Sequence, residues 1–100
     1  MKFQKLVYVR EVARSNLNVS KASKTLFTSQ PGISKQIKLL EEELDVELFE
    51  RSGKHLVAIT PVGERILEQI EEILALVDGI KHAATEFSDE EYGTLSIATT

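Results

Sequence analysis

The most informative stretch of the sequence is Ser29-Gln30-Pro31-Gly32-Ile33-Ser34-Lys35-Gln36-Ile37-Lys38-Leu39-Leu40. Ser29 is a good N-cap, because its hydroxyl can accept a hydrogen bond from a free backbone N–H. Pro31 suits the first helical turn, where its missing N–H costs nothing. One stripe of the resulting helix is apolar and consists of Ile33, Ile37, Leu40 and Leu44. The opposite face carries Pro31, Ser34, Lys35 and Lys38. This pattern is typical of a helix that enters a DNA major groove, with an ordinary surface helix as the alternative.

Two shorter helices are predicted before this one. Residues 2–14 have helical apolar periodicity, and the stretch Ser15-Asn16-Leu17-Asn18 ends that helix. Ser20 is expected to cap a second helix that ends at Leu26, and Ala22 is small enough to let the next helix cross closely. Three short helices with a tight turn between the last two predict a helix-turn-helix.

A hairpin is predicted after the third helix, which is expected to end near Leu44-Asp45. Residues 48–51 and 55–60 are expected to be strands, and Gly53 supplies the permissive backbone of the turn. The hairpin would form a wing with Lys54 at its tip and with Arg51 and His55 beside it, able to place a cation on phosphate or in the minor groove. A purely structural hairpin with solvated charges is the alternative.

A long helix is predicted to begin at Thr60-Pro61 as N-cap and first helical residue, and to run to Phe87. Its apolar residues recur at alternating spacings of four and three, as in a coiled coil. The preceding domain is too small to cover this whole stripe, so self-association is expected. The residues predicted to mediate dimerisation are Ile66, Ile70, Ile73, Val77 and Ile80. Gly79 is expected to weaken the helix or to mark a close approach between helices.

The chain is therefore mainly α, and we divide it into four parts. Residues 1–60 are the winged helix-turn-helix, residues 61–87 the linker helix, and residues 88–93 an acidic hinge. Residues 94–100 alternate like a strand that has no partner, so they are expected to begin a further domain.

Charge is distributed unevenly along the chain, although the net charge is −4. Residues 1–38 hold eight basic side chains and one acidic side chain, whereas residues 61–100 hold two basic and nine acidic ones. Attraction to phosphate depends on the local face rather than on the total. The asymmetry favours a basic, DNA-facing head on an acidic stalk.

Enzyme chemistry is not predicted. There is no cysteine, and the two histidines, His55 and His82, fall on different elements. The carboxylates of residues 41–43 and 71–72 are expected to be solvated surface, since neighbours on a helix do not face each other. Phosphate-binding and nucleophile motifs are missing from the sequence. We therefore predict no catalytic residues, cofactor or metal, no signal peptide or membrane span, and a cytoplasmic location.

Several separated motifs resemble the DNA-binding region of LysR-type transcriptional regulators. They are the stretch from Ser29 to Ile37, Leu40-Glu41, Leu48-Phe49-Glu50-Arg51 and Thr60-Pro61-Val62-Gly63. Residues 16–20, 51–56 and 96–100 are most similar to the cysteine-biosynthesis regulator (CysB-like) branch. Two positions depart from the family pattern: Asp45 stands where the family usually has Gly, and Val62 where it usually has Ala.

The resemblance implies a winged helix-turn-helix, a linker helix that dimerises, and an effector domain of two α/β lobes. It implies dimers that pair into tetramers on promoter DNA, with RNA polymerase as a further candidate partner. Thr99 and Thr100 fall where the effector pocket begins, and an acetylated serine is the inducer expected in the cysteine branch. The DNA-binding residues that we predict are Ser29, Gln30, Pro31, Ser34, Lys35, Lys38, Arg51 and Lys54.

We therefore interpret the chain as part of a bacterial transcriptional regulator in which two recognition helices, held by antiparallel linker helices, enter the major grooves of an inverted repeat. The rival interpretation is a protein-interaction module that dimerises through the coiled-coil helix without binding DNA. Salt-dependent affinity for duplex DNA separates the two.

Overall fold

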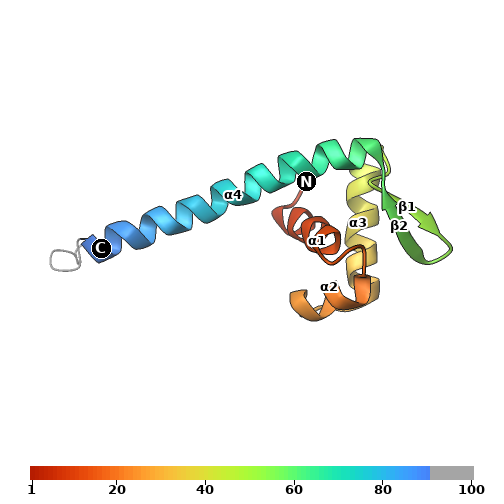
Figure 1. The fold of residues 1–100 in the computed structure, drawn as a ribbon, viewed down its shortest axis with the longest axis horizontal. Coiled ribbons are helices and arrows are strands. Elements are labelled where there is room, and N and C mark those ends of the chain that lie inside the picture. The colour runs from red at the N-terminus through yellow and green to blue at the C-terminus, as the bar shows by residue number, and fades with distance from the viewer. Residues whose placement is uncertain (91–100) are drawn as a thin grey trace.

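The computed structural model describes residues 1–90 and the side chains of residues 1–87. A head of three helices and a hairpin is followed by one long helix that extends away from it (Figure 1). The elements in chain order are α1 (Phe3–Arg14), α2 (Val19–Leu26), α3 (Gln30–Leu44), β1 (Phe49–Ser52), β2 (His55–Ile59) and α4 (Pro61–Glu90). The predicted fold class, a mainly helical winged helix-turn-helix with a long following helix, is confirmed.

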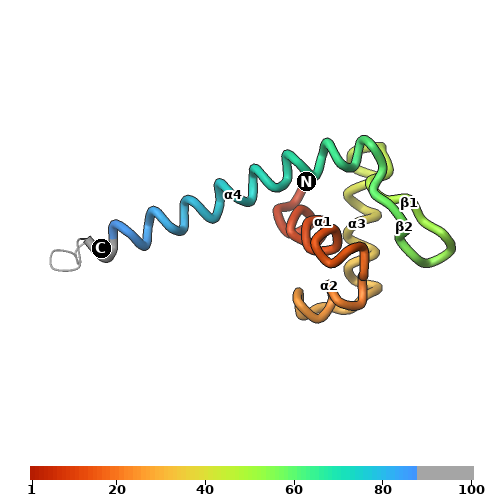
Figure 2. The backbone as a smooth tube through the Cα atoms, in the orientation of Figure 1, coloured from red at the N-terminus to blue at the C-terminus, as the bar shows by residue number. Residues whose placement is uncertain are grey.

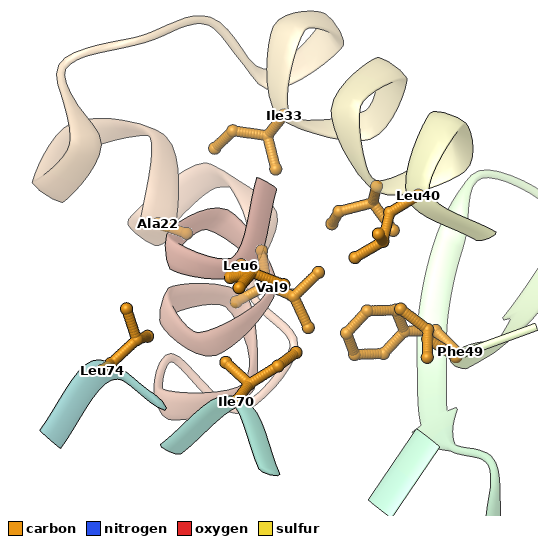
Figure 3. Close-up of a cluster of buried hydrophobic side chains, with 11 residues drawn as sticks. Leu6, Val9, Ala22, Ile33, Leu40, Phe49, Ile70 and Leu74 are labelled. Carbon is orange, nitrogen blue, oxygen red and sulfur yellow. The ribbon is translucent and has the colours of Figure 1, made fainter. Parts of the chain in front are cut away.

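The core of the head lies where α1 packs against α3 on one side and against α4 on the other. Figure 3 shows Leu6 and Val9 of α1 between Ile33 and Leu40 of α3 and the α4 residues Ile70 and Leu74. Burying an aliphatic side chain of this kind contributes about 1.5–3 kcal/mol. The first turns of α4 are therefore part of the head and hold the linker helix in a fixed direction.

The start of α2 differs from the prediction. The N-cap is Asn18 rather than Ser20, because the Asn18 side chain accepts a hydrogen bond from the backbone N–H of Lys21 at 3.0 Å. Asn is at least as good a capping residue as Ser. Ser20 then lies inside the first turn. Ala22 is fully buried in the core of the head, where α2 packs against α1 and α3.

Both ends of α3 have clear local causes. Ser29 caps the helix as predicted, its hydroxyl oxygen accepting from the backbone N–H of Gly32 at 3.0 Å. Asp45 ends it by adopting the left-handed conformation with φ of 58°. That conformation favours Gly but is also open to Asp. The departure from the family pattern at this position therefore leaves the helix end in place.

The hairpin pairs β1 with β2 in antiparallel register, from Phe49 opposite Ile59 to Ser52 opposite His55. Gly53 makes the turn at a φ of 63°, as the sequence predicts. The register shifts between Glu50 and Arg51, because β2 carries one extra residue, Val57, opposite this step. A bulge bends a strand and changes the direction of its side chains.

The linker helix α4 continues to Glu90, three residues beyond its predicted end. The backbone tube in Figure 2 shows it as one uninterrupted helix. It continues through the start of the expected hinge because residues 88–90 contain neither Gly nor Pro to end it. The remaining hinge residues, the strand expected at 94–100, and Thr99 and Thr100 lie outside the described residues. No helix within residues 1–90 has the length and apolar character to cross a membrane.

Candidate nucleic-acid interface

A groove runs between the N-terminal half of α3 and the hairpin. Its lining brings together six of the eight side chains that the sequence predicts to contact DNA: Gln30, Pro31, Ser34, Lys38, Arg51 and Lys54. Ser29, the N-cap of α3, and Lys35 within α3 are exposed but do not line the groove. The fold thus places polar and basic residues from two separate segments on one surface.

The packing of α3 orients this surface. Ile33, Ile37 and Leu40 are buried in the head, so the residues between them on the opposite side face outward. Ser34 and Lys38 are accordingly exposed, one turn apart. A serine hydroxyl can donate to or accept from a base edge, and a lysine ammonium can bind phosphate or guanine.

The positive charges of the interface are available for a ligand. Among the side chains of residues 1–87, Lys35, Lys38 and Lys54 form no ion pair with a carboxylate. Lys54 lies at the tip of the hairpin, directly after Gly53, and is exposed. Lys38 and Lys54 are therefore unneutralised cations in the groove, and Lys35 is a third on the exposed surface of α3.

Arg51 differs from these lysines. Its Nη2 donates to the Glu41 carboxylate at 2.8 Å and its Nη1 to the backbone carbonyl oxygen of Phe49 at 3.3 Å. Its side chain is 30% exposed and lines the groove while its guanidinium is engaged in these contacts. A contact between Arg51 and DNA stays a prediction. Its bonds to Glu41 and Phe49 give Arg51 an additional, structural role within the head.

Glu41 corrects the sequence interpretation, which placed it with Glu42 and Glu43 on solvated surface. It is 6% exposed, and its Oε2 accepts hydrogen bonds from the backbone N–H groups of Leu48 and Phe49 at 2.7 and 3.2 Å. The sequence contains a signal for the burial of Glu41. Glu41 follows Ile37 by four residues, and this spacing places it at the edge of the apolar stripe.

The apolar stripe on α4 divides into two parts. Ile70 is only 2% exposed and lies in the core of its own head, and Ile66 packs against the same core. Beyond them, Ile73 is 43% exposed and Ile80 69% exposed, with Val77 half-buried. The surface available to a second chain therefore begins near Ile73. This exposed surface also includes Leu76 and Phe87, which are not among the predicted dimerisation residues.

The close approach of a second helix at Gly79 stays a prediction. A Cβ atom on Gly79 would meet nothing within 4 Å, so no other part of the described chain approaches the helix there. The base of the helix is instead tied to the head by an ion pair of 3.0 Å between Arg14 of α1 and Glu71.

A helix-turn-helix followed by a basic-tipped hairpin defines the winged class of helix-turn-helix domains. Within that class, residues 3–64 match the family described as "Bacterial regulatory helix-turn-helix protein, lysR family". The chain belongs to the LysR family of bacterial transcriptional regulators. The resemblance on which the sequence interpretation relied is thereby confirmed.

Two curated relatives are similar along the whole chain. The transcriptional regulator CysB of Haemophilus influenzae is 49% identical over 100 residues, which are all of this chain and 31% of the relative. The regulator SsuR of Burkholderia cenocepacia is 43% identical over all of this chain and 32% of the relative. The chain thus spans about a third of the length of these curated relatives.

Solved structures agree with the fold. The CbnR_DBD–DNA complex matches with a TM-score of 0.76 and 34% identity, covering 88% of this chain and 99% of that one. The BenM_DBD/catB site 1 DNA complex matches with a TM-score of 0.80 and 28% identity, covering 91% and 96%. Both are crystal structures of complexes with DNA.

Proposed function

We propose that this chain binds duplex DNA sequence-specifically as the DNA-binding part of a LysR-type regulator. The observation that carries the proposal is the groove in which α3 and the hairpin bring their polar and basic residues together. The exposed face of α3 enters a major groove, and the hairpin tip reaches the adjacent backbone or minor groove. The solved CbnR and BenM complexes with DNA support this arrangement.

The roles of the interface residues follow from their chemistry. Gln30 and Ser34 read base edges, because an amide and a hydroxyl carry donors and acceptors that distinguish base pairs. Lys35 and Lys38 bind phosphate or guanine. The other four predicted DNA-binding residues make contacts that fix the position of the helix and the wing on the DNA: Ser29, Pro31, Arg51 and Lys54.

We propose that the chain forms a homodimer through α4, and that the full-length protein forms tetramers. The support is the exposed apolar stripe, in which Leu76 is 70% and Ile80 69% exposed. Large apolar side chains that recur at coiled-coil spacing gain stability when a second helix covers them. Two heads held in this way bind the two halves of an inverted repeat. RNA polymerase is a further proposed partner at the promoter.

The regulon that we propose is sulfur assimilation and cysteine biosynthesis. CysB and SsuR are the basis of this assignment, because each is similar along all of this chain. In the same proposal, residues 1–60 recognise DNA, α4 links, and residues 94–100 begin an effector domain. Thr99 and Thr100 then stand at the edge of a pocket for a small molecule. The site of action is the bacterial cytoplasm.

A selection experiment tests the proposal. Duplexes that the chain retains from a randomised pool are sequenced, and the affinity for the enriched duplex is compared with the affinity for a scrambled duplex of equal length. We expect an enriched inverted repeat and at least about 10³-fold tighter binding to it. Retention without enrichment would contradict sequence-specific recognition. The rival protein-interaction module is not favoured by the family assignment.

A further inference from the structure

We propose that Glu41 is a positioning residue for DNA recognition, which sets the orientation of the wing relative to the recognition helix through Arg51. The inference rests on the proposed function, because it assumes that α3 and the hairpin contact the same DNA. It assigns a role in recognition to a buried carboxylate that DNA cannot reach. It also gives Arg51 a second role besides the predicted contact.

A single carboxylate joins the two recognition elements. Glu41 belongs to α3, and its Oε1 accepts from Nη2 of Arg51 in β1 at 2.8 Å. Its Oε2 accepts from the backbone N–H groups of Leu48 and Phe49, at the start of the same strand. Four hydrogen bonds, including a longer one of 3.4 Å from Nη1 of Arg51, therefore connect the recognition helix to the base of the wing.

These bonds are strong for their kind because the acceptor is a buried carboxylate in all of them and the donor is the charged Arg51 guanidinium in two. The Glu41 side chain is 7% exposed. Charge-assisted hydrogen bonds are shorter and about twice as strong as neutral ones. Removing the carboxylate would leave two buried backbone N–H groups without their acceptor, a change that structures avoid. The strand is therefore held at a fixed place on the helix.

The wing needs such an anchor. A two-stranded hairpin is at best marginally stable by itself, so its direction depends on contacts with the head. The pairing shifts between Glu50 and Arg51, where β2 carries one extra residue, Val57, and Arg51 of β1 reaches back to Glu41 just after this shift. Lys54 follows only three residues later at the tip. A change at the base is thus transmitted directly to the cation that is proposed to reach the DNA.

The position of the tip matters because both sides of the groove must fit one duplex. Gln30, Ser34 and Lys38 line it from the helix, and Lys54 lines it from the wing. A binding constellation has to be held within about 0.5 Å of its productive geometry to keep full affinity. The Glu41–Arg51 pair supplies that constraint between the recognition helix α3 and the first strand of the wing, β1.

The sign of the mutational effect distinguishes positioning from electrostatics. Removing a negative charge near DNA ordinarily strengthens binding, because it reduces repulsion of the phosphates. Glu41→Gln and Glu42→Gln remove the same charge from neighbouring residues of α3, but Glu42 is exposed and Glu41 buried. Positioning predicts that only Glu41→Gln weakens binding, because a glutamine amide cannot accept from both backbone N–H groups and Arg51.

The experiment measures affinity for the duplex enriched by the wild-type chain, over several salt concentrations. We expect Glu41→Gln to weaken binding about tenfold and Glu42→Gln to leave it equal or tighter. Lys54→Ala should weaken duplex binding several-fold when it is introduced into the wild-type chain. In the Glu41→Gln chain it should cause little further loss of affinity, because a displaced wing no longer presents Lys54 to the DNA. The proposal would be overturned if the losses of affinity caused by Glu41→Gln and Lys54→Ala multiplied in the double variant. It would also be overturned if the Glu41→Gln chain bound the duplex as tightly as the Glu42→Gln chain.

Folding is controlled by circular dichroism and thermal unfolding of each variant. If Glu41→Gln does not fold, Arg51→Lys replaces it in the same comparison, because lysine keeps the charge but loses the paired contacts to Glu41 and Phe49. A folded Arg51→Lys chain with unchanged affinity and an unchanged effect of Lys54→Ala would overturn the proposal equally. Failure of the wild-type chain to enrich any duplex would instead refute the proposed function, so the two failures are distinguishable.

Discussion

Gly63, in the first turn of α4, lies directly against the backbone carbonyl of Leu48, at the entrance to the hairpin. A Cβ atom at position 63 would overlap the Leu48 oxygen and come within 2.9 Å of the Thr60 hydroxyl. Thr60 itself bridges the two segments, because its hydroxyl donates to the Glu47 carbonyl and accepts from the Gly63 N–H. The wing and the linker helix therefore join at a point where only glycine fits.

Gly63→Ala should accordingly destabilise the head. Backbone atoms cannot move aside as a flexible side chain can, so the overpacking should lower the free energy of unfolding by about 1–3 kcal/mol. Urea denaturation followed by circular dichroism measures the change. Gly79→Ala is the matched control, because a Cβ there meets nothing and alanine favours a helix by about 1 kcal/mol. Equal effects at the two positions would contradict the close contact at Gly63.

Substitutions on α3 should separate base reading from phosphate binding. Ser34→Ala is expected to weaken binding to the enriched duplex by about 1–3 kcal/mol and to leave scrambled DNA unchanged. Lys38→Ala should weaken binding to both duplexes alike and reduce the salt slope by about one unit, if Lys38 binds phosphate. Titrations by fluorescence anisotropy at several salt concentrations measure both quantities. Unchanged affinity of the Ser34 variant for the enriched duplex would remove that residue from the site.

The exposed part of the α4 stripe should control dimerisation. Ile80→Asp places a charge where the proposed second helix would bury it, so the variant should be monomeric and retain the melting temperature of its head. Thr85→Asp is the control, because it adds the same charge to an exposed residue off the apolar stripe. Light scattering distinguishes the states. A dimeric Ile80→Asp chain would count against α4 as the interface.

Ile70→Asp tests the division of the stripe. Ile70 is 2% exposed inside its own head, so an aspartate there should unfold or strongly destabilise the monomer rather than only separate two chains. Thermal unfolding measured below the concentration of dimer formation gives the answer. A stable head in the Ile70→Asp variant would show that this residue does not belong to the core.

The carboxyl of Glu43 provides a pH-dependent contact. A hydrogen bond from the amino-terminal ammonium, assisted by one from Lys5, holds the pKa of Glu43 below its usual value. The contact therefore adds stability above the unfolded pKa, and that stability is lost as the pH falls through the lowered, folded pKa. Acetylation of the amino terminus should raise the pKa most and Lys5→Met less, measured by NMR titration. Lys2→Met is the control and should have no effect.

Most of the fold could be predicted because its signals are local. The apolar period of α3, the glycine at the hairpin turn, and Thr60-Pro61 before α4 each identify an element from its own residues. The residues of the proposed site followed from the same period, since burial of Ile33 and Ile37 leaves Ser34 and Lys38 outside. The cap of α2 was missed because Asn18 and Ser20 are both good capping residues and only the hydrogen bond decides between them.

The remaining features depend on contacts between distant residues. Helical period shows that Ile70 is on the apolar face, but not whether its own head or a second chain covers that face. Glu41 stands in a run of three glutamates, and only the approach of Leu48, Phe49 and Arg51 makes it different from its neighbours. The groove likewise requires the wing to fold back beside α3, which no single segment encodes.

The most direct test of the account is the salt dependence of the wild-type chain's affinity for its enriched duplex. If the basic face of α3 and the wing tip bind DNA phosphates, the logarithm of the association constant should fall linearly with the logarithm of the salt concentration. For contacts with about six or more phosphates, affinity should fall by roughly 10³-fold between about 50 and 200 mM salt. An affinity that stays constant across this range would contradict DNA binding by this surface.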